Sequence, residues 1–278
     1  MDIGQLLKSA RQGFSLGWKV ESNWTDPWLF SIYSIIRPFA ALLIVAFIYI
    51  IGSQAGGTVN PEFLAYLLVG NTFFIYAATI LLTMGWLLHD DREHYEVFKH
   101  IYISPGTIHS YLLGRGLAAA SIATVSVVLT LVFGVALFNL PIDPLAINYP
   151  LLIASVAVGV PSLIFTGYML YGVSLISAKL EWALGEYVSG IFFLLAGVIF
   201  PPEVLPTWVQ PLSNVLPLTY FLRVVRTSML SPGAPLPASD LLYLVLYSLA
   251  TAALGLVVFR LAEQRAKKRG LIDMKAVY

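Results

Sequence analysis

Residues 108–138 read IHSYLLGRGLAAASIATVSVVLTLVFGVALF, a run with one arginine and no acidic side chain. The hydrocarbon core of a bilayer is about 30 Å thick and a helix rises about 1.5 Å per residue, so about 20 apolar residues can cross it. Five further apolar stretches lie at residues 30–51, 63–88, 151–176, 184–200 and 241–261. The sequence therefore predicts an all-α membrane protein with six transmembrane helices.

The composition excludes a soluble globular protein. Hydrophobic residues make up 58% of the chain and charged residues only 11%, whereas soluble domains have about 25% charged residues. The chain has no cysteine, which excludes a disulfide framework, a thiolate metal site and a thiol nucleophile.

Basic residues are distributed unevenly between the two sides of such a bundle. Cytoplasmic segments of membrane proteins carry the excess of lysine and arginine. If the N-terminus is cytoplasmic, 14 of the 16 basic residues fall on the inner side, and only Arg223 and Arg226 fall outside. The inner set is Lys8, Arg11, Lys19, Arg37, Arg92, Lys99, Arg115, Lys179, Arg260, Arg265, Lys267, Lys268, Arg269 and Lys275. This distribution predicts a multi-pass protein of the cell membrane with both termini in the cytoplasm.

The first 27 residues have the pattern of an amphipathic helix. Lys8 and Lys19 lie on different faces from an apolar stripe. The stripe consists of Ile3, Leu6, Leu7, Ala10 and Phe14. A helix of this kind lies in the headgroup region with its apolar side toward the acyl chains. We therefore expect residues 1–27 to form an interfacial segment and residues 28–278 to form the six-span domain.

The connector between the second and third predicted spans reads HDDREHYEVFKHIYISPG, residues 89–106. Its apolar side chains recur every three or four residues, which predicts an amphipathic helix over about 92–104. These side chains are Tyr95, Phe98, Ile101 and Tyr102. The Pro105-Gly106 pair would end the helix. A short helix across the ends of two spans is a candidate docking element for a partner.

The connector also concentrates histidine and carboxylate side chains, so an intramembrane metal-dependent enzyme is one alternative. The cluster at 89–100 consists of His89, Asp90, Asp91, Glu93, His94, Glu96 and His100. Imidazole and carboxylate groups bind divalent metals, but a di-iron or prenyl-transfer site needs a second cluster that no other connector supplies. A solvated, partner-facing helix explains the same charges. We therefore expect no bound metal and no enzymatic activity of the chain's own.

The segment before the last span reads GVIFPPEVLPTWVQPLSNVLPLTYFLRVVR, residues 197–226. Five prolines interrupt its apolar pattern, and Arg223 and Arg226 would be costly at the centre of a bilayer. A re-entrant or interfacial helical hairpin over about 200–230 satisfies both constraints if protein or water covers its backbone. After the last span, we expect the basic cytoplasmic tail at 262–278 to contact anionic lipid rather than nucleic acid.

These segments resemble the ABC-2 type permease family, the membrane subunits of a class of ABC exporters. The resemblance is carried by the N-terminal amphipathic helix, by the connector ending in Ile103-Ser104-Pro105, and above all by the series before the last span. That series is Gly197, Phe200, Pro201, Leu205-Pro206, Trp208, Pro217-Leu218, Tyr220 and Arg226. The similarity extends over essentially the whole chain in segment order and span count.

The resemblance implies a dimer formed with a second copy or a similar permease, each subunit served by a separate ABC ATPase. The sequence has no G-x-x-x-x-G-K-[ST] phosphate loop, so ATP and Mg²⁺ would bind to that partner and no cofactor to this chain. By the same analogy the connector helix docks in a groove of the ATPase. The implied coupling residues are Arg92, Glu93, Tyr95, Glu96, Phe98, Lys99, Ile101 and Tyr102. The implied function is ATP-driven export of a hydrophobic, amphipathic, lipid or glycan substrate.

Aromatic side chains offer a possible substrate path. They are Phe73, Phe74, Tyr76, Phe192 and Phe193. Packing between helices or contact with lipid explains the same residues. An ion-coupled secondary transporter is a second alternative, but it usually needs an acidic residue at mid-span, and the central parts of the second, third, fourth and sixth spans contain none.

Overall fold

The structure is a computed structural model that describes residues 3–22, 26–56, 60–104, 107–177, 183–231 and 233–271. Every regular element within these ranges is a helix, which confirms the all-α class. The elements are α1 (Ile3–Ser22), α2 (Pro27–Gly56), α3 (Pro61–His89), η1 (Asp90–His94), α4 (Phe98–Ile103), α5 (Ile108–Phe138), α6 (Tyr149–Ile176), α7 (Leu184–Leu195), η3 (Pro202–Val204), α8 (Gln210–Val215), α9 (Pro217–Leu230) and α10 (Ala238–Lys268).

Three of the long helices begin at side-chain caps that the local sequence provides. The Asn60 side chain accepts hydrogen bonds from the first turn of α3, which starts with Pro61. Thr107 accepts a bond from the Ser110 backbone N–H at 3.2 Å, and Asn148 caps α6 in the same way. Polar caps satisfy backbone donors that a helix start leaves unpaired, and proline fits the first helical position. The polar breaks between apolar runs therefore set where these helices begin.

Four described helices are long and apolar enough to cross a membrane, which supports a multi-pass membrane protein. They are α3 continued by η1, then α5, α6 and α10. In α2 the apolar part covers Pro38–Gln54. The fifth predicted span, residues 184–200, is helical only over the 12 residues of α7, about 18 Å of helix. The count of six spans therefore stays a prediction.

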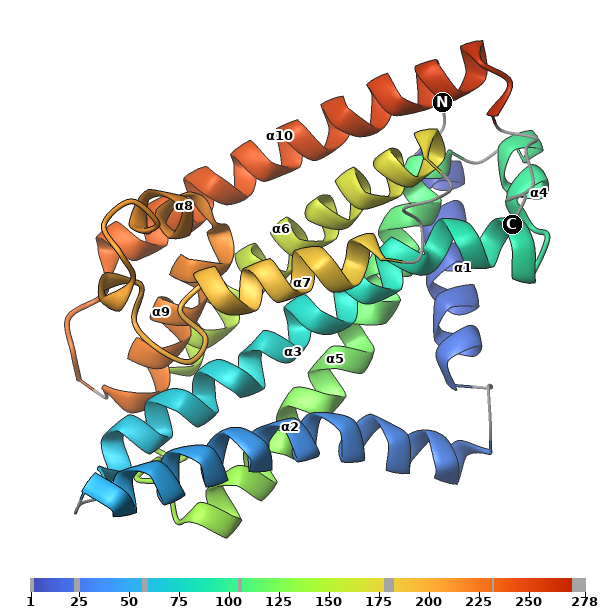
Figure 1. The fold of residues 1–278 in the computed structure, drawn as a ribbon. Helices are drawn as coiled ribbons and strands as arrows, with labels where there is room; N and C mark the ends of the chain where they lie inside the picture. Colours follow the sequence, from blue (N-terminus) through green and yellow to red (C-terminus); the bar gives the residue numbers. More distant parts are fainter. Residues whose placement is uncertain are drawn as a thin grey trace.

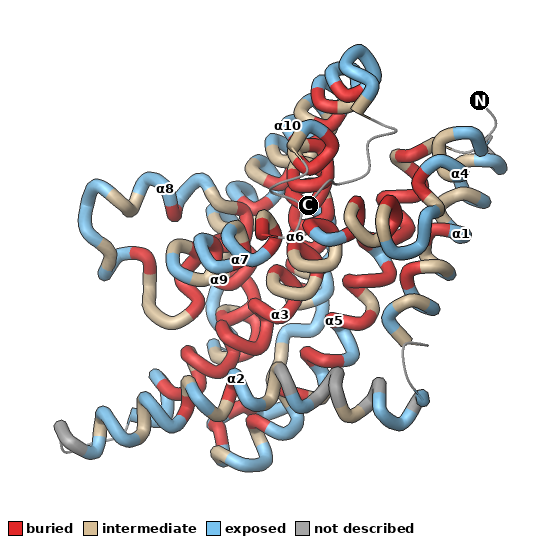
Figure 2. The backbone as a smooth tube through the Cα atoms, turned by 45° about the vertical axis from the view of Figure 1, so that its right-hand side comes forward, coloured by how far each residue is buried: buried red, intermediate tan, exposed pale blue. Residues whose placement is uncertain are grey.

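Helix α3 is the centre of the bundle. It packs against α2, α5, α6, α7 and α9, and Figure 1 shows it running between them. Its sequence is apolar on all sides, as expected for a helix that other helices surround. Figure 2 shows burial concentrated along α3 and α6, whereas α10 and α2 expose much of their surface. In a membrane these exposed apolar faces would meet lipid or another subunit.

Helix α1 packs against the first half of α5, and glycines lie at the contact. A Cβ atom added at Gly114 would lie 2.2 Å from the Ala10 carbonyl oxygen, and one at Gly13 would lie 2.5 Å from the Tyr111 carbonyl oxygen. The two backbones are therefore in direct contact, as small residues allow between helices in lipid. The predicted N-terminal helix is present, and part of its apolar stripe, such as Leu7 at 67% exposure, still faces outward. Its position in the headgroup region stays a prediction.

Replacing Gly114 with alanine should lower the stability of the protein by about 1–3 kcal/mol, because the added methyl group has only backbone atoms to displace. Thermal unfolding in detergent measures the effect. Gly190→Ala in α7 is the matched control, since a Cβ atom added there would have no neighbour within 4 Å, and it should be neutral or slightly stabilising. Equal melting temperatures for the two variants would contradict the close α1–α5 contact.

The last helix is longer than its apolar run. The predicted tail at 262–278 begins inside α10, which continues as a helix to Lys268, with Ala262 and Ala266 buried. Several residues used in the sequence argument lie outside the described residues. These are residues 1–2, 23–25, Pro105, Gly106, Lys179 and 272–278, and the Arg37 side chain.

Candidate functional site

The connector is not the single helix predicted for residues 92–104. Helix α3 continues into η1 as a π-helical turn, in which the Tyr95 backbone N–H donates to the Asp90 carbonyl oxygen at 2.8 Å. The helix then breaks, because Glu96 adopts a left-handed conformation with φ of 53°, and L-residues do not continue a right-handed helix from there. Six residues of α4 follow. The prediction of one continuous helix was wrong, since side-chain spacing does not reveal such a break.

The apolar edge of the connector faces the bundle of the chain itself. Phe98 is only 2% exposed, and Ile101 and Tyr102 are half-buried against the core. The outward face instead carries Tyr95 at 38% exposure and Ile103 at 79%. Most of the apolar side chains that were predicted to contact a partner therefore pack against the helices of the chain itself.

The remaining implied coupling residues divide between the two faces. Arg92 is 8% exposed and its guanidinium lies 5.2 Å from the centroid of the Phe98 ring. Glu93 is half-buried, whereas Glu96 and Lys99 are exposed. Arg92 thus helps to hold α4 against the end of α3. Of the exposed residues, Glu96 follows Tyr95 directly, and Lys99 lies four residues from both Tyr95 and Ile103.

A buried carboxylate and a buried guanidinium lie beneath the connector. Asp91 is completely buried, and the Tyr111 phenol donates to its two carboxylate oxygens at 2.8 and 2.9 Å. Arg115 on α5 is 2% exposed and attracts Asp91 electrostatically. It also attracts Glu21, near the end of α1. Arg115 therefore places a buried positive charge near acidic groups of α1 and of the connector, and the Tyr111 hydrogen bonds are the direct contact between α5 and the connector.

Sequence reasoning missed the burial of Asp91 because it placed this residue on a solvated helix. The signal that was available is Arg115 itself, which stands between two glycines in an otherwise apolar run. A charge inside a membrane segment usually has a partner. Among the described residues, no three His, Cys, Asp or Glu side chains group as a metal site requires, so the metal-enzyme alternative gains no support.

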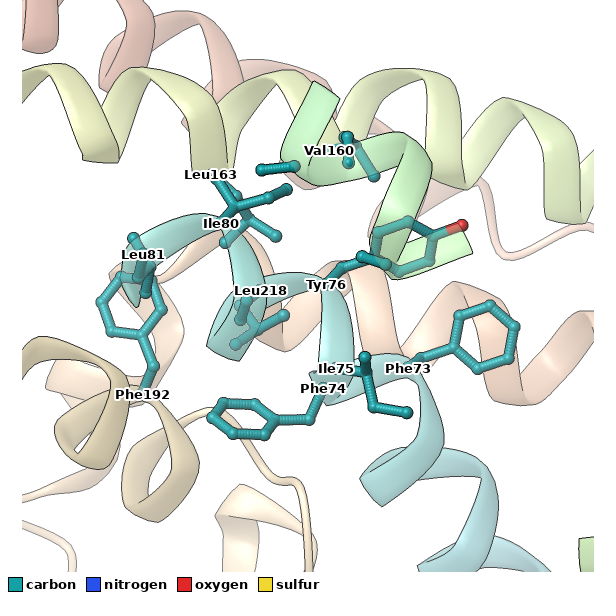
Figure 3. Close-up of a cluster of buried hydrophobic side chains, with 14 of the residues drawn as sticks. Phe73, Phe74, Ile75, Tyr76, Ile80, Leu81, Val160, Leu163, Phe192 and Leu218 are labelled. Carbon is teal, nitrogen blue, oxygen red and sulfur yellow. The ribbon is translucent and has the colours of Figure 1, made fainter. Parts of the chain in front are cut away.

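The five aromatic residues of the possible substrate path do not line one path. Phe74 and Phe193, with ring centroids 5.0 Å apart, line a cavity of about 450 Å³ between α2, α3 and α7. Phe73 and Tyr76 line a second cavity of about 730 Å³ between α3, α5 and α6. Phe192 is buried in the core. Figure 3 shows Phe74 and Phe73 leaving α3 in different directions.

The segment predicted to form the outer hairpin, residues 197–230 and below called the outer hairpin, is held to α3 by Arg226. This residue is 6% exposed, and its guanidinium donates to the carbonyl oxygens of Gly197 and Val198 at 2.8 Å each and of Tyr66 at 3.2 Å. It also lies 3.6 Å from the Tyr66 ring centroid. A Cβ atom at Gly70 would overlap the guanidinium, so only glycine leaves this space.

Two of these carbonyls come just after α7, where Gly197 turns the chain with φ of 77°. The C-terminal end of a helix has unpaired carbonyls and a partial negative charge, which a cation satisfies. Arg226 therefore binds the turn that follows α7 and joins it to α9 and α3. The cost of burying an arginine is offset by these three hydrogen bonds.

The other members of the hairpin series lie on or around α8 and α9. Pro217 is the first residue of α9 and is buried, and Tyr220 is buried with its phenol donating to the Asn214 carbonyl oxygen at 3.0 Å. Phe200 and Pro201 are half-buried, whereas Trp208 is 77% exposed. Pro206 begins the short turn before α8, where its carbonyl accepts from Val209 at 2.8 Å.

Arg223, the second arginine of the hairpin, is paired at the surface. It forms ion pairs with Glu203 and with Asp240, the latter at 3.7 Å. The two acidic groups therefore have a partner within the chain. Arg223 and Arg226 are the two basic residues that fall outside the predicted inner set. Each of them has partners within the chain.

Comparison with known proteins identifies the family of the chain. A family model described as ABC-2 type transporter matches residues 15–230, which run from within α1 to the last residue of α9. A search of curated proteins found no match. The matched region includes the connector and the series before the last span, both of which carried the resemblance. Because the match covers most of the chain, the protein belongs to the ABC-2 type transporter family, whose membrane domain is the permease component of an ABC transporter.

Proposed function

We propose that the protein is the permease of an ATP-driven exporter and that a separate ABC ATPase subunit hydrolyses the ATP. The observation that carries this proposal is the structure of the connector. Its Tyr95 and Ile103 side chains are exposed, whereas Phe98 is buried against the bundle. A partner that pushes this exposed face would displace α3 and α5 together, because η1 continues α3 and the hydrogen bonds from Tyr111 to Asp91 tie the connector to α5.

The proposed substrate is hydrophobic or amphipathic, of the lipid or lipid-linked glycan class. The cavity between α2, α3 and α7 supports this choice, since apolar side chains such as Phe74 and Phe193 surround a few polar ones. The polar groups include Asn71, Thr79 and Thr83. Mostly apolar cavities with few polar groups suit ligands that have both characters.

We propose a dimer with a second copy of the chain, in the cell membrane and with cytoplasmic termini. Two walls of this cavity, α2 and α7, expose large apolar side chains that a second permease would cover, such as Ile48 and Ile191. ATP binding and hydrolysis would then shift the dimer between inward and outward arrangements.

The docking face can be tested with the double substitution Tyr95→Ala and Ile103→Ala. Removing two exposed apolar contacts should weaken binding of the ATPase subunit about tenfold or more, while the permease stays folded. Affinity measured between purified subunits, and ATP-dependent transport in liposomes, give the readouts. Leu145→Ala, on a side chain that is 95% exposed, is the matched control and should change neither.

Phe98→Ala tests the buried side of the connector separately. This change should cost about 3–5 kcal/mol of stability, because Phe98 is 2% exposed.

Unchanged ATPase affinity in the Tyr95 and Ile103 double variant would remove the docking assignment. Transport by the purified chain without any ATPase would contradict the proposed function as a whole.

A further inference from the structure

Helix α10 extends along the whole bundle, from the outer hairpin to the side on which the connector lies (Figure 1). Its 31 residues correspond to a length of about 46 Å. Its main packing partners are α6 and α9. The family match ends before it, at residue 230, so its role has to be argued from its contacts.

The inner end of α10 contacts the connector. The Lys267 ammonium lies 5.5 Å from the centroid of the Tyr102 ring and is paired with Glu263 at 2.8 Å. The Tyr102 ring lies 5.0 Å from the Phe98 ring, which in turn is held by Arg92. Burial raises the pKa of the Tyr102 phenol above its usual range, so the ring is neutral. A continuous row of contacts therefore runs from the end of α3, through α4, to α10.

The outer end of α10 contacts the hairpin. The Tyr220 ring on α9 lies 5.3 Å from the Tyr243 ring and 5.4 Å from the Tyr247 ring, both on α10. Arg223 adds an ion pair to Asp240 in the first turn of α10. Aromatic contacts and an ion pair thus join α9 to the start of the last helix.

Between its ends, α10 is packed closely on one side only. A Cβ atom at Gly255 would lie 2.5 Å from the Phe165 carbonyl oxygen, and one at Gly172 would lie 3.1 Å from the Phe259 Cα atom. The other side exposes leucines, including Leu249 and Leu261. A straight helix that is held along one face and borders lipid on the other can slide or tilt as a unit, as packed helices do in shear motions.

We propose that α10 transmits displacement of the connector to the outer hairpin, with the Tyr102–Lys267 contact as its inner joint and Tyr220, Tyr243 and Tyr247 as its outer joint. This inference rests on the proposed function, because it needs an ATPase that moves the connector. Helix α3 is the competing route, since it leads from η1 to the carbonyl oxygen that binds Arg226. The two routes can be tested separately, because Lys267 belongs to the α10 route and not to the α3 route.

The test uses the complex of the full chain with its ATPase subunit, reconstituted in lipid nanodiscs. The absence of cysteine allows a single fluorescent label at Val204→Cys, in η3 on a side chain that is 71% exposed. The measurement is the fluorescence change when ATP and vanadate trap the ATPase. Lys267→Met should reduce this change about threefold or more, while ATP hydrolysis by the complex is retained.

Three further variants make the result specific. Lys268→Met removes the same charge from an exposed neighbour and should leave the hairpin signal intact. Lys267→Arg keeps a cation above the ring and should also keep the signal. Tyr247→Leu, at the outer joint, should reduce the signal as Lys267→Met does, and combining the two should add little, since both interrupt one route.

The outcomes separate the two proposals. A signal that is reduced in Lys267→Met but not in Lys268→Met supports transmission through α10. An unchanged signal in Lys267→Met overturns this inference and leaves the proposed function standing, with α3 as the route. No signal from the label in the otherwise unaltered complex, although that complex hydrolyses ATP and transports its substrate, overturns the inference alone, because the hairpin then does not respond to the ATPase. Absence of ATP-dependent transport by the same complex overturns the proposed function and the inference with it.

Discussion

Replacing Arg226 with alanine should lower the free energy of unfolding by about 3–5 kcal/mol. The substitution removes three hydrogen bonds from a guanidinium that is 6% exposed and leaves the Gly197, Val198 and Tyr66 carbonyl oxygens without that donor. It also opens a space beside Gly70. We expect the outer hairpin to separate from α3, with a lower melting temperature in detergent and faster proteolysis between α7 and α9.

Arg223→Ala is the matched control, because it removes the same side chain one turn earlier on α9. Arg223 is 29% exposed and forms ion pairs at the surface, which contribute about 0–1 kcal/mol. Its melting temperature should therefore stay close to that of the unaltered protein. A similar loss in both variants would show that the carbonyl contacts of Arg226 do not stabilise the hairpin.

Arg115→Met should have a comparably large effect, of about 3–5 kcal/mol, because it leaves the buried Asp91 carboxylate without its cation. Methionine keeps much of the volume of the arginine stem, so the loss reports mainly the charge. We expect the connector and α1 to loosen together, since Arg115 attracts acidic groups of both. Thermal unfolding and hydrogen exchange over residues 90–104 are the measurements.

Adding Asp91→Asn to Arg115→Met should recover part of the lost stability, because the buried charge is then removed with its partner. The asparagine side chain can still accept a hydrogen bond from Tyr111. Lys19→Met on the exposed side of α1 is the control for loss of a cation and should be nearly neutral. A double variant that is less stable than Arg115→Met would contradict the electrostatic attraction between Asp91 and Arg115.

Much of the fold follows from local chemistry. Apolar runs longer than the bilayer thickness require helices, because a helix satisfies its own backbone in lipid. The polar caps at Asn60, Thr107 and Asn148 set where three of them begin. Prolines likewise stand in the first turns of α8 and α9. The short α7 was not predicted, because the turn at Gly197 depends on Arg226 to satisfy the carbonyls that it leaves open.

The connector shows where sequence reasoning fails. The spacing of Tyr95, Phe98 and Tyr102 predicts an apolar edge, but it does not say whether that edge meets a partner or the chain itself. The answer depends on Arg92 and on Lys267 of α10, the latter far away in the sequence. The left-handed Glu96 is equally invisible to periodicity.

By itself, the sequence determined the all-helical membrane class, the family resemblance and the segments that differ from simple spans. Those properties depend on composition and on spacing over a few turns, which the chain displays directly. Only the tertiary structure decided that Phe98 and Asp91 are buried, that Arg115 lies beneath α1, and that the aromatic residues of α3 face two cavities. The physical reason is that burial and charge pairing depend on neighbours from distant helices, and these are brought together only when the bundle packs.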